Sequence, residues 1–543
     1  MASEPVASFD YIVVGAGSAG CVLASRLTEN PGVRVLVLEA GGWPTGVFKD
    51  MPVAFPRYVQ RKDLNWNFLS EPEPGLNGRS LPVPRGKAMG GSSTINGMVY
   101  ARGHRRDYDD WARMGLKGWG YADVLPYFKR SERSWLGEGK YHGGTGPMEV
   151  CISGPELMYD ELKASVLAAG YPVTADYHGD ESEGLHFNEM TVSGGRRGGT
   201  ARVFLKPAMG RRNLQVQPRA HATRILIENG RAAGVEYLQD GQTRTAKAGR
   251  EVILTGGVYG SPQLLMLSGI GPAQALKAVG IEPRLDLPGV GMNLIEHPLV
   301  FVGWPVKPGA ATSHLRLDRA IAQVLQWALL GKGLFATNAC AGHVFLRTDP
   351  AWDRPDIQLT CPAVGMSAGD VWMSFGEPNQ MLVSVVSMIR EDSRGVVSLR
   401  SADPLEPPKI LFNLFQERSD VERMIRGIRA ARRIYTAPPL GDLTLPEAMP
   451  GEGAEGDEAL EAFIRATGEI TQHPVGTCRM GPDGDPMAVL DAELRVRGID
   501  GLRVADASVM PNVPGGNTNA PAIMVGEKAA DLIRGKTLAP AEL

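Results

Sequence analysis

The fold follows from Asp10-Tyr-Ile-Val-Val-Gly15-Ala-Gly17-Ser-Ala-Gly20, a stretch that predicts a buried strand, a glycine turn and the start of a helix. A second apolar run, Val33-Arg-Val-Leu-Val-Leu-Glu39-Ala-Gly41, predicts the next strand and ends on a carboxylate. A strand, a Gly-x-Gly-x-x-Gly turn, a helix and a strand ending in an acid form the signature of a dinucleotide-binding unit. A glycine turn alone is also a common structural device, so the prediction depends on all four parts together.

The residue types in this unit suit a bound dinucleotide. Gly15 permits the tight turn, Gly17 lets a pyrophosphate approach bare N–H groups at the positive end of the helix, and Gly20 lets helix and strand pack closely. Glu39 lies 24 positions after Gly15 and can accept hydrogen bonds from ribose hydroxyls. The pattern predicts a dinucleotide without separating FAD from NAD.

Composition predicts a globular protein of more than one domain. The 543 residues exceed one ordinary hydrophobic core, and the 43% hydrophobic and 22% charged residues exclude a disordered chain. The formal net charge of −3 gives no electrostatic support for nucleic-acid binding. We therefore expect two or more domains and no nucleic-acid partner.

Cysteine usage and hydropathy predict a cytoplasmic location, and peripheral contact with the inner membrane stays open. Five scattered cysteines show neither a disulfide framework nor metal spacing, which favours a reducing compartment. The first strand begins by Asp10, which leaves no room for a secretion signal, and no apolar run reaches about 18 residues. Residues 320–330 form the most apolar helix, which we expect in the core rather than at a membrane surface or in a lid.

Two further segments have distinctive composition. Residues 86–100 are rich in glycine and small hydroxyls, which suits contact with a flat ligand or a phosphate, although a flexible connector has the same composition. Residues 214–254 predict a β-meander with turns at Asn229-Gly230 and Asp240-Gly241. A second glycine turn follows, and Ser261-Pro262 predicts the cap and first turn of a helix.

The pattern changes between about residues 300 and 470, where we expect a second domain. Residues 381–389 and 396–400 predict strands of another sheet, and residues 420–435 predict an amphipathic helix. The final segment returns to a strand from residue 502, which ends at Asp506, and a helix over 522–534. The carboxylate of Asp506 suits a sugar or ribityl hydroxyl, or it caps a helix.

Four separated stretches resemble one family, the glucose-methanol-choline (GMC) oxidoreductases, especially its choline-dehydrogenase-like members. They are the glycine turn with Glu39; residues 86–96; residues 257–272 with 289–297; and residues 473–480 continuing to Glu527. The resemblance covers nearly the whole chain. It implies an α/β protein, α+β overall, with a Rossmann-type FAD-binding domain of three segments and a substrate-binding domain whose antiparallel sheet is flanked by helices. The implied segments are 1–155, 200–300 and 475–543 for FAD, and 156–199 and 301–474 for substrate.

The resemblance implies FAD as the cofactor and assigns residues to its site. Some relatives attach the flavin through a histidine where this chain has Ile95, so we expect non-covalent FAD. The implied cofactor-binding residues are Gly15, Gly17, Ser18, Ala19, Gly20, Glu39, Ala40, Gly90, Ser92, Asn96, Gly97, Met98, Val99, Asp506, Ala507, Asn517 and Thr518.

The same resemblance implies a catalytic pair, His473 and Asn517. An imidazole with a pKa of about 6.5 is mostly neutral at pH 7 and can accept the hydroxyl proton of an alcohol. Asn517 lies 44 residues after His473, near the family's spacing for a partner that donates a hydrogen bond to the substrate oxygen, and Asn519 is the alternative.

The expected reaction is oxidation of a primary alcohol, aliphatic or aryl, to the aldehyde, with hydride transfer to flavin N5 and His473 as base. The expected partners are a small-molecule alcohol and oxygen or a quinone-type acceptor, with the protein a monomer or homodimer.

We find no carboxylate and aromatic cage for choline, so choline is not the expected substrate. The alternative is a lyase or a light-driven fatty acid photodecarboxylase of the same fold, but no arginine accompanies Cys340 and Cys361 at the place that branch uses, and burial explains both cysteines. A nicotinamide dehydrogenase is a weaker alternative.

Overall fold

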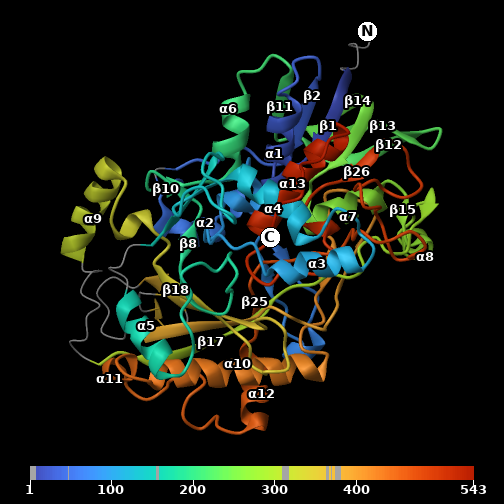
Figure 1. The fold of residues 1–543 in the computed structure, drawn as a ribbon. Coiled ribbons are helices and arrows are strands. Elements are labelled where there is room, and N and C mark those ends of the chain that lie inside the picture. The colour runs from blue at the N-terminus through green and yellow to red at the C-terminus, as the bar shows by residue number, and fades with distance from the viewer. Residues whose placement is uncertain are drawn as a thin grey trace.

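The structure is a computed structural model that describes residues 8–46, 48–153, 158–307, 317–362, 366–367, 370–373 and 381–543. Two large sheets organise it, one nearer each end of the molecule as drawn in Figure 1, with helices packed against both. A mixed sheet with a parallel core and an antiparallel meander, beside a second sheet that is antiparallel throughout, confirms the predicted fold class. Each sheet has its own hydrophobic core.

The first sheet has seven strands drawn from distant parts of the chain. Its order is β11 (Leu214–Pro218), β2 (Val35–Glu39), β1 (Ser8–Val14), β14 (Gln242–Leu254), β13 (Arg231–Gln239) and β12 (His221–Glu228), with β26 (Leu502–Val504) also beside β14. β1 is parallel to both β2 and β14 and is buried from Tyr11 to Val14. A parallel strand buried on both faces is apolar throughout, as this one is.

The predicted meander is correct for three of its four strands. β12, β13 and β14 are antiparallel, and the two turns have positive φ at Asn229, Gly230, Asp240 and Gly241, as two-residue hairpin turns require. The first predicted strand was assigned wrongly, because β11 pairs with β2 in parallel and forms an edge of the sheet. Its alternation of Leu214, Gln215, Val216 and Gln217 fits an edge strand of either direction, so the pattern does not reveal its neighbour.

Helices from both chain ends cover the first sheet. α1 (Ser18–Leu27) packs on α13 (Asn519–Ile533), which in turn packs on α4 (Tyr121–Ser131). A Cβ at Gly526 would lie 2.9 Å from the carbonyl oxygen of Ala19, so the two helices approach backbone to backbone. This contact brings the carboxyl-terminal segment against the glycine turn.

The helix after the second glycine turn starts earlier than predicted. α7 runs from Gly257 to Leu267 and contains Pro262 within it, so Ser261 is not its cap. Instead the Ser261 hydroxyl donates to Asp506 and accepts from the N–H of Gly256. The serine side chain therefore ties the start of this helix to the last strand of the sheet.

The second sheet has six antiparallel strands. Its order is β25 (Glu469–Ile470), β17 (Pro298–Pro305), β22 (Met381–Met388), β19 (Ile357–Pro362), β18 (Cys340–Leu346) and β7 (Gly184–Phe187). The predicted amphipathic helix is α10 (Arg418–Thr436), which packs on β22. A Cβ at Gly427 would lie 2.9 Å from both Ile357 and Val386, so the helix lies close on this face. The other face of the sheet lines the cavity described below.

Shorter elements complete the structure. The remaining α-helices are α2 (Phe55–Val59), α3 (Arg105–Arg113), α5 (Tyr159–Ala168), α6 (Lys206–Ala208), α8 (Ala273–Ala278), α9 (Leu317–Leu330), α11 (Leu440–Leu443) and α12 (Asp457–Thr467). Within the described part of the chain, β23 (Val396–Ser398) pairs with β24 (Lys409–Leu411) alone, so the predicted strand at 396–400 exists outside the large sheets. Further small sheets are β5 (Glu132–Ser134), β6 (Met148–Ile152) and β8 (Glu189–Met190); β3 (Phe68–Leu69) and β4 (Pro82–Val83); β9 (Val192–Ser193) and β10 (Arg196–Arg197); β15 (Ile270–Gly271) and β16 (Leu285–Asp286); and β20 (Met366–Ser367) and β21 (Asp370–Met373).

The apolar helix predicted for the core lies at the surface. In α9 the side chains of Ile321, Leu325 and Leu329 are 68%, 54% and 78% exposed, and Figure 1 shows the helix at the edge of the molecule. Trp327 is its buried anchor and donates through Nε1 to the carbonyl of Gly195. The prediction was wrong because an apolar stripe reveals which face could be buried and not whether a partner covers it.

Three sequence expectations can be set beside the described residues. No described helix combines the length and hydropathy needed to cross a bilayer. All five cysteines are described and free of disulfide bonds. The domain boundaries at residues 155, 199, 300 and 474 stay a prediction.

Candidate active site

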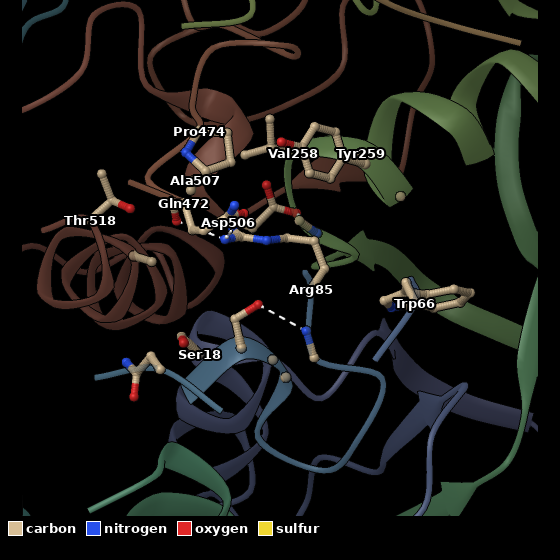
Figure 2. Close-up of a pocket in the computed structure, with 18 of the residues that line it drawn as sticks. Ser18, Trp66, Arg85, Val258, Tyr259, Gln472, Pro474, Asp506, Ala507 and Thr518 are labelled. Atoms are coloured by element: carbon tan, nitrogen blue, oxygen red, sulfur yellow. Dashed lines mark hydrogen bonds between the residues drawn. The ribbon is translucent and has the colours of Figure 1, made fainter. Parts of the chain in front are cut away.

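A cavity of about 600 Å³ lies where the separated segments meet. Its walls come from the glycine turn, the segment around Ser92, the start of α7, one face of the six-stranded sheet and the carboxyl-terminal segment. Figure 2 shows Ser18, Asp506, Ala507 and Thr518 on one side of this pocket and Trp66 on another, with Arg85 extended toward Gln472. Residues hundreds of positions apart in the chain therefore share one ligand site.

Glu39 lines the cavity and is oriented by the backbone. Its Oε2 accepts from the N–H of Ala16 and its Oε1 accepts from the N–H of Gly41, both at 2.8 Å. Burial outweighs these hydrogen bonds and raises the pKa of Glu39 to about 7. The carboxyl group keeps free lone pairs toward the cavity, where ribose hydroxyls could bind it.

Every predicted cofactor residue lines the cavity except Gly20 and Gly90. Gly20 lies behind the turn, where a Cβ would meet the carbonyl oxygen of Gly15 at 2.0 Å, so its role is the close packing of turn and helix. Gly91 lines the cavity in place of Gly90, and a Cβ on it would lie 2.7 Å from the Cα of Gly17. Two glycine segments thus touch and form a cradle of bare backbone.

This cradle fits an extended dinucleotide. Bare N–H groups at the start of α1 suit a pyrophosphate, Glu39 suits a ribose, and the cavity continues from there to His473. Ile95 lines the same cavity and carries no nucleophile that could attach a flavin. The residues present fit FAD bound without a covalent bond.

Asp506 lies at the cavity but is already satisfied by the protein. Its Oδ1 accepts from the N–H and hydroxyl of Ser508, and its Oδ2 accepts from the N–H of Gly257 and the hydroxyl of Ser261. The carboxylate therefore caps the short helix at 507–509, which is the structural alternative that the sequence left open. It also joins the last strand to the start of α7 beside the cavity.

His473 and Asn517 meet at the wall of the same cavity. The Nδ2 of Asn517 lies 2.9 Å from the Nε2 of His473, and both side chains line the cavity. Asn519, the alternative partner, instead accepts a hydrogen bond from the hydroxyl of Ser18 at 2.7 Å. The geometry favours Asn517 as the partner of His473.

The surroundings of His473 keep its ring neutral. Burial, followed by the charges of His297 and Arg85, lowers the pKa of His473 well below its usual range. The His297 ring meets the His473 ring edge-on at 5.8 Å, and its own Nδ1 lies 3.0 Å from Glu391. A neutral imidazole at this position can accept a proton at pH 7.

A buried carboxyl holds the backbone of His473. The Oε1 of Glu296 accepts from the N–H of His473 at 2.7 Å and from the Thr471 hydroxyl at 3.1 Å. Burial raises the pKa of Glu296 to about 7. Because this contact is made to the main chain, it fixes the position of the residue without using either ring nitrogen.

One face of the six-stranded sheet forms the wall beside this pair. Side chains alternate across a strand, so Leu299 and Phe301 of β17, Val385 and Ser387 of β22, and Gln358 and Thr360 of β19 share a face. The register places Ser387 between Leu299 and Gln358, and Val385 between Phe301 and Thr360. All six line the cavity, and none of them is charged.

Sequence reasoning missed this wall and the basic residue beside it. Arg85 lines the cavity and donates through Nη2 to the carbonyl oxygen of Gln472 at 2.7 Å. The strand over 381–389 was predicted, but alternation alone does not tell which face meets a ligand. Cys340 and Cys361 are buried and absent from the described cavity lining, and burial raises the pKa of Cys361 to about 12, which fits two inert thiols.

Comparisons with known proteins show which family this chain is similar to. A family model described as GMC oxidoreductase matches residues 9–299, and a second of the same description matches residues 391–526. An oxygen-dependent choline dehydrogenase of Rhizobium johnstonii is 44% identical over 529 residues, which cover 97% of this chain and 96% of the relative. The crystal structure of pyridoxine 4-oxidase from Mesorbium loti is similar with a TM-score of 0.86 and 29% identity, covering 96% of this chain and 98% of that one. A formate oxidase structure has a TM-score of 0.91 and 29% identity, covering 98% and 99%.

Proposed function

We propose that this chain, which belongs to the GMC oxidoreductase family, oxidises an uncharged primary alcohol, aliphatic or aryl, to the aldehyde. The family membership makes it an FAD-dependent oxidoreductase acting on CH–OH donors. The single observation that carries the proposal is the pair of His473 and Asn517, 2.9 Å apart, in the cavity that also holds the glycine cradle. A neutral base can accept the hydroxyl proton of an alcohol, and an amide donor can stabilise the charge that develops on its oxygen.

In this proposal the two side chains act on the substrate hydroxyl. The Nδ2 of Asn517 donates a hydrogen bond to the alcohol oxygen and so positions it beside His473. The Nε2 of His473 accepts the hydroxyl proton as the carbon–oxygen double bond forms. FAD, when bound, supplies the acceptor for the hydride that leaves the carbon. Glu296 keeps His473 in position through the main chain.

The wall formed by Leu299, Phe301, Val385, Gln358, Thr360 and Ser387 supports an uncharged substrate. The carboxylates among the described lining residues are Glu39, which accepts from the N–H groups of Ala16 and Gly41, and Asp506, which accepts four hydrogen bonds from the protein. A quaternary ammonium ion is held by an aromatic cage together with a facing carboxylate. The aromatic residues of the described lining are Phe55, Trp66, Phe68, Tyr259 and Phe301, and no free carboxylate accompanies them among the described lining residues. We therefore propose that this chain differs in substrate from its relatives named choline dehydrogenases. The proposed electron acceptor is oxygen or a quinone-type compound.

Anaerobic mixing of the yellow holoenzyme with a panel of alcohols tests the proposal. We expect benzyl alcohol and medium-chain primary alcohols to bleach the flavin absorbance, and choline to do so at least about tenfold less efficiently. Holoenzyme that no alcohol bleaches contradicts the proposal. Carbon dioxide released from a fatty acid only under illumination would instead support the photodecarboxylase alternative.

A further inference from the structure

A hydrogen-bonded chain of buried polar side chains connects the backbone beside the glycine cradle, through the second sheet, to Asn517. It consists of Asn338, Asn188, His343 and Gln358, all of them buried. Each member hydrogen-bonds to the next, and the first bonds to the backbone of Gly97 beside the glycine cradle. Because amides and neutral imidazoles each present one donor side and one acceptor side, such a chain can transmit an orientation.

Backbone groups fix the first amide. The Nδ2 of Asn338 donates to the carbonyl oxygen of Gly97 at 2.7 Å, and its Oδ1 accepts from the N–H of Cys340 at 3.3 Å. A carbonyl cannot donate and a main-chain N–H cannot accept, so the amide of Asn338 has one orientation. Its oxygen is therefore an acceptor for the next residue.

The second amide and the imidazole follow from the first. The Nδ2 of Asn188 donates to the Oδ1 of Asn338 at 2.7 Å, which leaves the Oδ1 of Asn188 facing the Nε2 of His343 at 3.1 Å. The proton of His343 therefore sits on Nε2. Burial lowers the pKa of His343 to about 3, so the ring is neutral and its Nδ1 is an acceptor.

The amide of Gln358 connects His343 to Asn517 of the catalytic pair and so fixes which side of the Asn517 amide faces His473. The Nε2 of Gln358 donates to the Nδ1 of His343 at 3.1 Å, and the same nitrogen lies 3.5 Å from the Oδ1 of Asn517. The oxygen of Asn517 is thus an acceptor, which turns its Nδ2 toward the Nε2 of His473. A donor facing Nε2 stabilises the tautomer in which that nitrogen carries the lone pair.

We propose that Asn338, Asn188, His343 and Gln358 are positioning residues that fix the amide of Asn517 and thereby keep the Nε2 of His473 unprotonated and ready to act as base. The inference rests on the proposed function and adds the residues that prepare its base. If the amide of Asn517 were rotated by 180°, its Oδ1 would face the Nε2 of His473 and stabilise a proton there. The free lone pair of the imidazole would then lie on Nδ1, which does not contact Asn517. In a catalytic triad the wrong tautomer costs about 10⁴-fold in rate, which is the upper limit for this effect.

Neutron diffraction from holoenzyme crystals exchanged into deuterated water tests the proposal without any turnover. We expect deuterium on the Nε2 of His343, none on its Nδ1, and the deuterated nitrogen of Asn517 pointing to His473. Deuterium on the Nδ1 of His343, or the oxygen of Asn517 turned toward His473, overturns it. This readout stands even if no alcohol reduces the flavin, so a failure of the proposed function is distinguished from a failure of the relay.

Gln358→Met and Gln358→Glu supply the kinetic test. Methionine removes the donor, so we expect flavin reduction by the best alcohol to slow about 10-fold; glutamate presents an acceptor that attracts the nitrogen of Asn517, and we expect about 100-fold. In both variants the rate of flavin reduction should fall at acid pH, because the Oδ1 of Asn517 can then face the Nε2 of His473 and favour the protonated imidazole. The other charged neighbours of this ring, His297, Arg85 and Glu296, are unchanged.

Ser153→Ala is the matched control. It removes one hydrogen bond to Asn188 but leaves the contact with Asn338 that orients the amide. We expect its reduction rate and pH profile to equal those of the wild type. Folded, flavin-loaded Gln358 variants with the wild-type rate and profile overturn the proposal.

Discussion

At the scale of single residues, the ring of His473 is kept neutral and correctly aimed by different neighbours. The main-chain contact with Glu296 holds the residue, the charges of His297 and Arg85 oppose a positive charge on the ring, and Asn517 faces Nε2. Removal of the ring from water is the largest of these influences on its pKa. The site therefore supplies an unprotonated imidazole over a wide range of pH.

This setting predicts an unusual pH dependence. The active form of the base is the neutral ring, so a lowered pKa extends activity toward acid. An imidazole with an ordinary pKa near 6.5 would lose about fourfold in rate between pH 8 and pH 6. Because the pKa of Glu296 is raised to about 7, the measurement uses Glu296→Gln, whose amide oxygen can still accept from the His473 N–H. We expect its limiting rate of flavin reduction at saturating alcohol to stay flat over this range, and an acid limb centred near pH 6.5 in this variant would contradict the account.

The sequence predicted the candidate pair but not the groups around it. The family's spacing, near 44 residues, admitted both Asn517 and Asn519, and only the fold shows that the Asn519 side chain bonds to Ser18. Gln358 carries no local signal, because its effect depends on His343 in a neighbouring strand. Contacts between strands distant in sequence cannot be deduced from one-dimensional patterns.

At the scale of elements, the site depends on two glycine segments that touch. Gly91 has a φ of +52°, and a Cβ on it would lie 2.7 Å from the Cα of Gly17 in the first turn. An L-residue in the left-handed region is strained, and a backbone atom cannot move aside as a side-chain end can. The close approach of the two segments therefore requires glycine at position 91.

Gly91→Ala should weaken FAD binding, because it pushes the second segment away from the first turn. We expect at least a tenfold loss of affinity, about 1.4 kcal/mol, measured by titrating apoprotein with FAD and following flavin fluorescence. Gly210→Ala is the control, because a Cβ there meets nothing within 4 Å and the residue lies outside the cavity lining. Equal affinities for the two variants would contradict the close approach.

Elements with a local signature were predictable, and those defined by a partner were not. The glycine turn, the two Asx-Gly hairpins and α10 carry their turn chemistry or periodicity in consecutive residues. α9 was misjudged because its apolar stripe does not reveal that no described element covers it. The start of α7 was misjudged because the Ser261 hydroxyl bonds to Asp506, a residue 245 positions away.

At the scale of the whole molecule, one buried carboxylate joins three distant parts of the chain. Glu527 of α13 is fully buried and accepts from Arg26 of α1 and from Arg130 of α4. Both guanidinium groups are partly exposed, whereas the carboxylate is not. These ion pairs hold the carboxyl-terminal segment, which carries Asn517, against the glycine turn.

Glu527→Gln should destabilise the protein strongly, because it leaves two guanidinium groups facing a neutral amide. We expect a loss of about 3 kcal/mol in the free energy of unfolding, the lower end for breaking a buried pair, measured by urea titration of the holoenzyme. Glu29→Gln removes a 40% exposed partner of the same Arg26 and should cost no more than about 1 kcal/mol. Similar losses for the two variants would show that burial of Glu527 does not set its contribution.

The overall plan was accessible from sequence only through family resemblance. Local patterns predicted a dinucleotide unit and a second domain, but they cannot show that β26 joins β14 across about 250 residues. Which strands pair is decided by the shape and burial of the whole sheet. The resemblance supplied the order of the segments and the identity of the cofactor.

The most direct test of the account is the rate of flavin reduction in His473→Ala under anaerobic single-turnover conditions, with the alcohol that best reduces the wild type. If His473 accepts the hydroxyl proton, the flavin-loaded variant should reduce about 10²- to 10⁴-fold more slowly, the usual contribution of a general base. A variant that retains its flavin and reduces at the wild-type rate would contradict the central claim.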